Sequence, residues 1–179
     1  MIYILQQIEL ARSGDDHSFI QLFQLYEKDI YRTVYIYVNN EQDAFDLVQE
    51  TAYRAFKAMK GLQQPQYFKT WLIKIAINCT LDFLRKSKKL TQRSIKELEY
   101  IQERFEDNFE EIDLQVTLQQ LMELLDPQEK SVIILRFYHD LTLHEIASTL
   151  SIPQGTAKTI YYRAVHKLRE KIKRGDLDE

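Results

Sequence analysis

Apolar residues recur every three or four positions through much of the chain, the spacing that places them on one face of an α-helix. Three such stretches occupy the first half, from Phe19 to Val38, from Ala44 to Met59 and from Phe68 to Phe83. An asparagine pair at residues 39–40 separates the first two, and a Gly-to-Pro segment at residues 61–65 separates the last two. The pattern predicts three helices packed into a first domain.

The third of these helices has a predicted inner face and a predicted outer stripe. The residues expected to face the core are Phe68, Trp71, Leu72, Ile75, Ala76, Cys79 and Phe83. The stripe on the other side consists of Lys74, Asn78, Leu81 and Arg85. Tyr67 precedes the helix and is expected to point outward, where an aromatic ring could hold an unstacked base. The alternative is that the neighbouring aromatics, Phe68 and Trp71, are simply core residues, which we expect for both.

Beyond Arg85 the apolar pattern weakens. Residues 86–113 are highly charged and are predicted to form a tether with transient helix, with a solvated helix packed on either domain as the alternative. From Leu114 onward the pattern predicts four short helices. Two of them begin with capping boxes, at Asp126–Glu129 and Thr142–Glu145.

The last two predicted helices are separated by a tight break at residues 151–153, which is typical of a helix-turn-helix. We therefore expect an all-α protein of two small helical domains. Their predicted bounds are residues 1–89 and 114–179, joined by a flexible, charged linker at residues 90–113.

Composition agrees with this fold class and indicates an intracellular protein. The 179 residues include four glycines and three prolines, too few for the turns of a many-stranded sheet. The single cysteine, Cys79, excludes an intrachain disulfide and suits a reducing compartment. No apolar run approaches the ~20 residues that span a bilayer, and the N-terminus lacks the basic flank of a signal peptide. We expect a cytoplasmic protein that does not insert into a membrane.

The net charge of −3 conceals an uneven distribution of charge. Basic residues predominate from Lys69 to Arg93 and again from Lys158 to Arg174, whereas acidic residues predominate from Glu97 to Asp113. Two basic blocks separated by an acidic one indicate two faces that bind nucleic acid. Ordinary solvated helix faces are the alternative interpretation.

The predicted last helix has an apolar sector and a basic face. Its inward residues are expected to be Ala157, Tyr161, Ala164, Leu168 and Ile172. The opposite face carries Lys158, Thr159, Tyr162, Arg163 and His166. Such a face offers a cation for phosphate, a hydroxyl, an aromatic ring and an arginine that can pair bidentately with guanine. A helical hairpin with a solvated basic face is the alternative.

The second predicted helix presents a largely acidic face opposite its apolar stripe. Asp46, Gln49 and Glu50 lie on this face, which would complement a basic protein surface. From physical chemistry alone, a solvated face is the better interpretation.

Several spaced motifs resemble those of the extracytoplasmic-function (ECF) sigma factors, which are small alternative specificity subunits of bacterial RNA polymerase. They are residues 43–51 (DAFDLVQET), residues 68–76 (FKTWLIKIA) with Asn78 and Asp82, and residues 155–159 (GTAKT) with Arg163. Residues 135–138 and 141–147 extend the resemblance. It covers about residues 19–89 and 114–172, and the motifs stand in the family's order.

The resemblance implies two helical domains, called regions 2 and 4. Region 2 would bind the clamp of core RNA polymerase through Asp46, Gln49 and Glu50 and would take the promoter −10 element. Its loop before the third helix would hold a flipped base, with Asn78 nearby. Region 4 would lay its last helix in the major groove of the −35 element. An anti-sigma protein, often membrane-bound, would hold such a factor inactive.

The chain departs from the family pattern at several positions. Phe45 stands where an acid is common, Ala52 where phenylalanine is usual, and Tyr162 where histidine or phenylalanine is frequent. Ile160 and Val165 replace arginines that are common in the last helix. We expect these two residues to flank its apolar sector, so that Ile160→Arg would strengthen DNA binding with little change in sequence preference.

These observations favour a sigma factor that is not itself an enzyme. The sequence has no Gly-rich phosphate loop, and its four histidines do not pair with Cys79 into a metal site, so no cofactor or metal is expected. Its expected partners are core RNA polymerase, promoter DNA and an anti-sigma factor. The main alternative is a helix-turn-helix regulator that acts without binding polymerase. A helical adaptor that binds only proteins is a more distant one.

Overall fold

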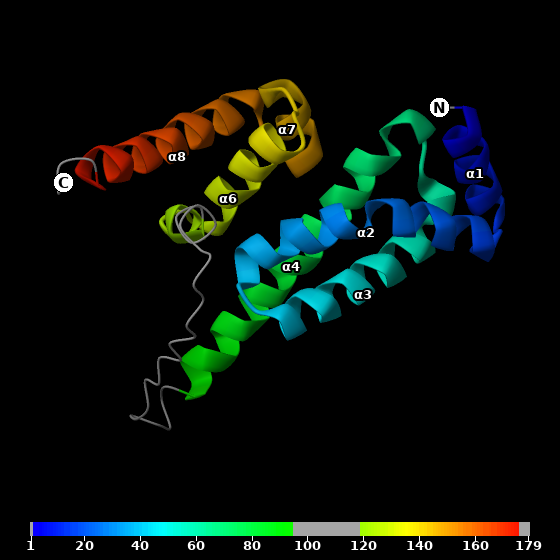
Figure 1. Cartoon of the computed structure of the whole chain (residues 1–179), viewed down its shortest axis with the longest axis horizontal. Coiled ribbons are helices and arrows are strands. Elements are labelled where there is room, and N and C mark those ends of the chain that lie inside the picture. Colours follow the sequence, from blue (N-terminus) through cyan, green and yellow to red (C-terminus); the bar gives the residue numbers. More distant parts are fainter. Residues whose placement is uncertain (1, 95–118, 176–179) are drawn as a thin grey trace.

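The computed structural model describes residues 2–94 and 119–175, and every regular element in these ranges is helical (Figure 1). The first group consists of α1 (Ile2–Ser13), α2 (Asp16–Val38), α3 (Glu41–Ala58), the turns η1 (Met59–Gly61) and η2 (Pro65–Tyr67), and α4 (Phe68–Ser94). The second consists of α6 (Pro127–Ile133), the short π-helix η3 (Ile134–Tyr138), α7 (Leu143–Leu150) and α8 (Gln154–Gly175). The predicted all-α class with two helical groups is confirmed.

Short polar residues set the ends of these helices. Asn39 ends α2 in a left-handed conformation with φ 48°, and the Asn40 side chain then caps α3 by accepting from the Asp43 N–H at 2.9 Å. Both predicted capping boxes are confirmed, with Asp126 at the start of α6 and Thr142 at the start of α7. Local sequence therefore determines where most elements begin.

The helix α1 was not predicted. It packs on α2 and the turns that precede α4, and it buries Ile8 and Ala11 in the core. Its apolar residues lie on all sides of the helix, with Tyr3, Leu5 and Leu10 exposed, so no apolar stripe marks it in the sequence.

The helix α4 is longer than predicted. It continues to Ser94, beyond the weakening of the apolar pattern at Arg85 and into the first residues of the predicted linker. Residues 95–113, the rest of that linker, lie outside the described residues, as does the start of the helix predicted from Leu114. The domain boundaries at residues 89 and 114 stay a prediction.

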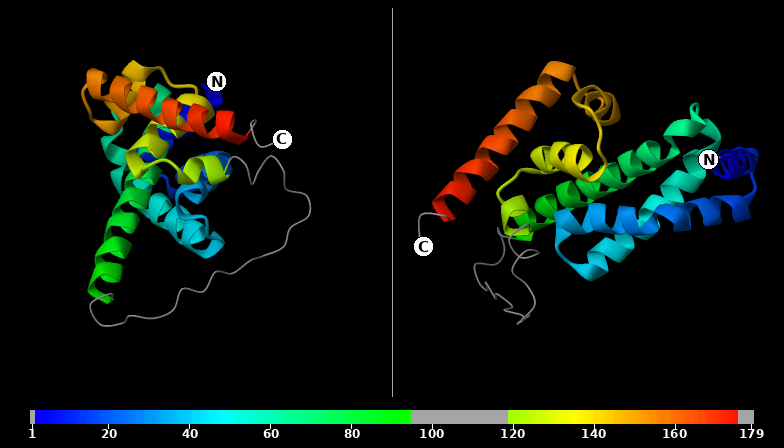
Figure 2. Two further views of the ribbon diagram at one scale, coloured as in Figure 1. Left: turned by 90° about the vertical axis from the view of Figure 1, so that its left-hand side faces the viewer. Right: turned by 45° about the horizontal axis from the view of Figure 1, so that its top comes forward.

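The two helical groups share a hydrophobic core, because α4 is buried on two faces. One face carries the predicted core residues Leu72 and Ala76 toward α2 and α3. The other carries Ile73, which lies with Leu135, His139 and Leu141 of the second group around a cavity of about 30 Å³. The views in Figure 2 show the second group packed along α4. We infer that the apolar residues of α4 form two packing faces, one for each helical group.

Hydrogen bonds also join the two groups. The Tyr37 hydroxyl of α2 donates to the Ser131 hydroxyl of α6 at 2.8 Å, and both side chains are buried. At the edge of the contact, the Arg32 guanidinium donates to the Tyr138 hydroxyl at 3.1 Å. The closed arrangement of the two groups is therefore held by polar as well as apolar contacts.

Candidate polymerase and DNA interfaces

The predicted polymerase face lies on α3. Asp46 and Gln49 are exposed and Glu50 is half-buried, and their spacing of three and four residues places them together on one side of the helix. Beside them Phe45 is 53% exposed, with its ring centroid 5.2 Å from that of Tyr31. The face therefore joins acidic groups to an exposed phenylalanine, whose ring contacts the half-buried Tyr31.

A chain of alternating charges connects this face to α4. The Arg54 guanidinium donates to Glu50 at 2.6 Å and to Asp82 of α4 at 2.9 Å. The other Asp82 oxygen accepts from Arg85, one of the predicted DNA-binding residues. The two carboxylates raise the pKa of Arg54 above its ordinary value, so the link stays charged.

The outer stripe of α4 is divided between solvent and the second helical group. Asn78 and Arg85 are exposed, and Tyr67 in η2 is 52% exposed, as predicted. Leu81 was expected on this outer stripe, but it is half-buried and packs against the hydrophobic clusters. Lys74 is half-buried, and its ammonium donates to the Ser151 hydroxyl at 3.0 Å.

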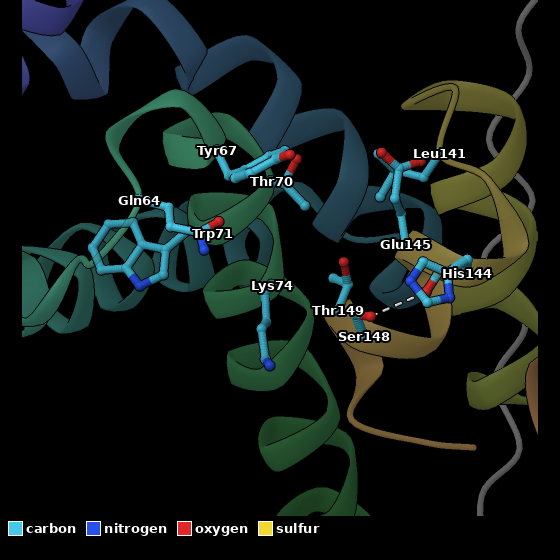
Figure 3. Close-up of a pocket in the computed structure, with 10 residues that line it drawn as sticks. All are labelled: Gln64, Tyr67, Thr70, Trp71, Lys74, Leu141, His144, Glu145, Ser148 and Thr149. Carbon is cyan, nitrogen blue, oxygen red and sulfur yellow. Dashed lines mark hydrogen bonds between the residues drawn. The ribbon is translucent and has the colours of Figure 1, made fainter. Parts of the chain in front are cut away.

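An open pocket of about 470 Å³ lies where α4 faces α7 (Figure 3). Gln64, Tyr67, Thr70, Trp71 and Lys74 line one side of the pocket, and Leu141, His144, Glu145, Ser148 and Thr149 line the other. Gln64 and Tyr67, from the loop predicted to hold an extruded base, therefore face the helix-turn-helix in this conformation, whereas Asn78 does not line the pocket.

The predicted DNA face of α8 is exposed. Lys158, Thr159, Tyr162 and Arg163 are all open to solvent, as is His166. The predicted inward residues Ala157 and Ala164 are fully buried, whereas Ile172 is 50% exposed and was wrongly expected to face inward. The helical phase holds for the first turns of α8 and fails at its end, where residues 169–172 are all exposed.

The burial of Ile160 contradicts a second expectation. It is 6% exposed and shares the main hydrophobic cluster with Ile146, Ala147 and Ala157. The flank of the apolar sector is covered by the preceding helices, so Ile160 is a core residue. The expectation that Ile160→Arg would strengthen DNA binding is therefore wrong.

Two cations of α8 bind one buried carboxylate. Glu129 of α6 is fully buried, and its oxygens accept from Arg163 Nε at 2.6 Å and from Lys167 Nζ at 2.7 Å. Burial would raise the pKa of the Glu129 carboxyl, but the hydrogen bonds from Lys167, the Asp126 N–H and Arg163 outweigh it and lower the pKa. The Arg163 side chain is thus half-exposed, and its Nε atom is held by Glu129.

His139 lies between the two helical groups. The Thr33 hydroxyl donates to the Asp29 carbonyl at 2.7 Å, so it accepts from His139 Nε2 at 3.1 Å. This arrangement leaves Nδ1 unprotonated, and that atom is buried without a hydrogen-bond partner among the described residues. Burial and the nearby Lys69 ammonium lower the pKa of His139 to about 4.

We expect this histidine to make the folded chain less stable in acid. Between about pH 6.5 and 4 the unfolded chain binds a proton on His139 and the folded chain does not, so stability falls with pH by at most about 1.4 kcal/mol per unit. Urea unfolding at several pH values tests this against His139→Gln, whose amide keeps a donor for Thr33. Equal pH slopes for the two proteins would contradict the assignment.

Other classes of site leave no trace in the described parts of the chain. Residues 2–94 and 119–175 contain no group of three or more His, Cys, Asp or Glu side chains placed to hold a metal ion. Within the same residues, no helix has the length and apolar content needed to cross a membrane.

Comparison with known proteins decides the family. The Sigma-70 region 2 model matches residues 22–90 and the Sigma-70 region 4 model matches residues 121–170. The RNA polymerase sigma factor SigV of Bacillus subtilis is 35% identical over 85% of this chain and 89% of its own length. The ECF RNA polymerase sigma factor SigW of the same organism is 30% identical over 95% and 97%.

The chain belongs to the ECF RNA polymerase sigma factors. It is an alternative sigma factor that directs transcription initiation. The first helical group contains region 2 of this sigma factor, and the second contains region 4.

Solved structures show the same fold. The sigma factor RpoE from Bartonella quintana, in complex with the anti-sigma factor NepR, has a TM-score of 0.70 at 22% identity, covering 87% of this chain and 96% of RpoE. CnrH in complex with the cytosolic domain of CnrY has a TM-score of 0.68 at 20% identity, covering 96% and 97%.

The main residue missed by sequence reasoning in this sigma factor is Glu129. The sequence marked it as the N3 residue of a capping box, and it does accept the Asp126 N–H at 3.0 Å. Its partners in region 4, Arg163 and Lys167, lie 34 and 38 residues away in the chain. A buried carboxylate opposite a basic helix is the signal that could have found it, but burial is not visible in the sequence.

Proposed function

We propose that this sigma factor binds core RNA polymerase through the exposed face of α3 formed by Asp46, Gln49 and Glu50. The support is their common orientation beside Phe45, an exposed aromatic residue. Protein interfaces commonly place an aromatic anchor inside a polar rim. The Glu50–Arg54–Asp82 chain also ties this face to α4, so polymerase binding and DNA binding would be mechanically connected.

We further propose that region 2 takes the promoter −10 element and region 4 takes the −35 element. On region 2, the DNA-binding residues would be Tyr67, Lys74, Asn78 and Arg85. On region 4, they would be Lys158, Thr159, Tyr162 and Arg163 on α8. The exposure of seven of these eight side chains supports the proposal, and Lys74 is the half-buried exception.

The closed arrangement bears on how these surfaces would be used. Lys74 is bound to Ser151, and Tyr67 faces α7 across the pocket of about 470 Å³. Single-stranded DNA needs this side of region 2 open. We therefore propose that regions 2 and 4 separate when the sigma factor joins polymerase at a promoter.

We also propose that an anti-sigma protein controls this chain. The support is that RpoE, which shares its fold, was solved in a complex with the anti-sigma factor NepR, and that CnrH was solved with the cytosolic domain of CnrY. The sigma factors are not an enzyme family, and this chain would act in the cytoplasm as a non-catalytic subunit of polymerase.

Run-off transcription tests the proposal as a whole. Purified chain added to core RNA polymerase on genomic fragments should give discrete transcripts that core polymerase alone does not produce. The chain should also co-purify with core polymerase. The opposite result is a chain that binds promoter fragments by itself but neither co-purifies with core polymerase nor supports these transcripts. Such a chain would be a regulator that acts without polymerase.

Asn78→Ala should impair promoter opening more than duplex binding. Losing one contact to an extruded base costs on the order of 1–3 kcal/mol, whereas contacts to duplex DNA remain. Permanganate footprinting of the reconstituted holoenzyme measures the opening, and filter binding measures the affinity for duplex. The matched control is Gln24→Ala, which removes an exposed amide from α2. Normal melting by the Asn78 variant would remove this residue from the base-binding site.

A further inference from the structure

We propose that Glu129 is a positioning residue, which holds Arg163 in the orientation from which it reads a guanine of the −35 element. This inference rests on the proposed function of α8. It adds a specificity-determining residue that belongs to α6 and does not itself touch DNA.

The first support is the burial and saturation of the Glu129 carboxylate. Glu129 is fully buried, and it accepts from Arg163 Nε at one oxygen and from Lys167 Nζ and the Asp126 N–H at the other. Because the N-cap bond fixes the carboxylate to the first turn of α6, its oxygens are held in place before any cation binds. A rigid carboxylate is suited to orient an arginine.

The second support is the part of Arg163 that remains free. Nε is bound to Glu129, and Nη2 lies 3.4 Å from the Asp126 carboxylate, whereas Nη1 has no hydrogen-bond partner in the described part of the chain. The side chain is 50% exposed. A guanidinium has five N–H donors in a planar fork, so the bond from Nε leaves donors on the terminal nitrogens for guanine O6 and N7.

The third support is the position of Arg163 on α8. It stands one helical turn after Thr159 and next to Tyr162, both of which are exposed on the predicted DNA face. A free arginine has many rotamers, and fixing one of them during binding lowers affinity by about 2- to 10-fold. By holding Nε in advance, Glu129 removes that cost for Arg163 and limits the directions from which it can donate.

Base analogues provide the test. Holoenzyme is assembled from core polymerase and the full chain, and its affinity is measured for a promoter found by run-off transcription. Each guanine of the −35 element is replaced in turn by 7-deazaguanine, which lacks the N7 acceptor. Wild-type holoenzyme should lose about 3- to 10-fold in affinity at one position, the value of one hydrogen bond.

Glu129→Gln should reduce this loss at the same position to below about 2-fold, as should Arg163→Ala. Glutamine keeps the size of the side chain and an oxygen for the Asp126 N–H, so the capping box is retained. The matched control is Lys167→Gln, which removes the other cation of the same carboxylate and should keep the wild-type response. A structural role of Glu129 would lower thermal stability without changing the response to N7.

Two outcomes would overturn the inference. In one, Glu129→Gln responds to 7-deazaguanine as wild type does. In the other it binds the promoter more tightly and loses more affinity on 7-deazaguanine than wild type does, which would mean that Glu129 withholds Arg163 from DNA. If Glu129→Gln does not fold, the double variant Glu129→Gln with Lys167→Gln is measured in its place. The double variant leaves no lysine ammonium beside the neutral amide of residue 129.

The inference and the proposed function fail in different ways. If no guanine analogue affects a holoenzyme that transcribes normally, Arg163 reads no guanine and the inference fails alone. If the chain supports no transcription with core polymerase, the proposed function fails as well.

Discussion

Ile160→Arg is expected to unfold region 4. Ile160 is 6% exposed and lies within the main hydrophobic cluster. Arginine there would place a charge among apolar side chains. Such changes cost about 3 kcal/mol or more, a large part of the stability of a small domain. Circular dichroism should show a melting temperature lower by about 10 °C or more.

The control for this variant is Tyr162→Arg, on the next residue of the same helix. Tyr162 is 61% exposed, so arginine there should change the melting temperature by no more than about 3 °C. If Ile160→Arg also melted within this range and bound promoter DNA more tightly, Ile160 would lie at the DNA face and the buried position would be contradicted.

The double variant Asp46→Arg with Glu50→Arg is expected to lose binding to core RNA polymerase. Placing two positive charges opposite a surface that selects acidic groups costs several kcal/mol, or more than about 100-fold in affinity. The α3 helix should persist, because its core residues Ala44, Leu47 and Val48 are untouched. Pull-down of core polymerase measures the binding, and circular dichroism measures the fold.

A change in net charge alone could weaken such a contact, so the control carries the same change elsewhere. Glu123→Arg with Glu170→Arg reverses two exposed acids in region 4 and should leave co-purification with core polymerase intact in the absence of DNA. If the folded α3 variant still co-purified with core polymerase at the wild-type level, the α3 face would not be the contact.

The outcome for α4 shows where reasoning from the sequence reaches its limit. Its predicted inner face was confirmed at Leu72, Ala76 and Cys79, because these positions repeat at helical spacing. Ile73 and Ile77 are equally buried but lie outside that stripe, and Ile73 shares a cavity with residues of region 4. A helix between two layers has apolar residues around most of its surface, and periodicity then no longer shows which neighbour covers which side.

The sequence by itself determined the features that depend on neighbouring residues and on motif order. These are the all-α class, the caps at Asn40, Asp126 and Thr142, and the sigma factor family. Capping needs contacts within three residues, so the local sequence is sufficient for it.

The tertiary structure alone decided what covers each helix and which charges meet. It placed Ile160 in the core, set Tyr37 against Ser131 across the two regions, and brought Arg163 to Glu129. These pairs lie far apart in the chain, and their distances depend on the packing angles of whole helices. An exposed arginine and an anchored one have the same place in a helical pattern, because that pattern contains no information about the partner.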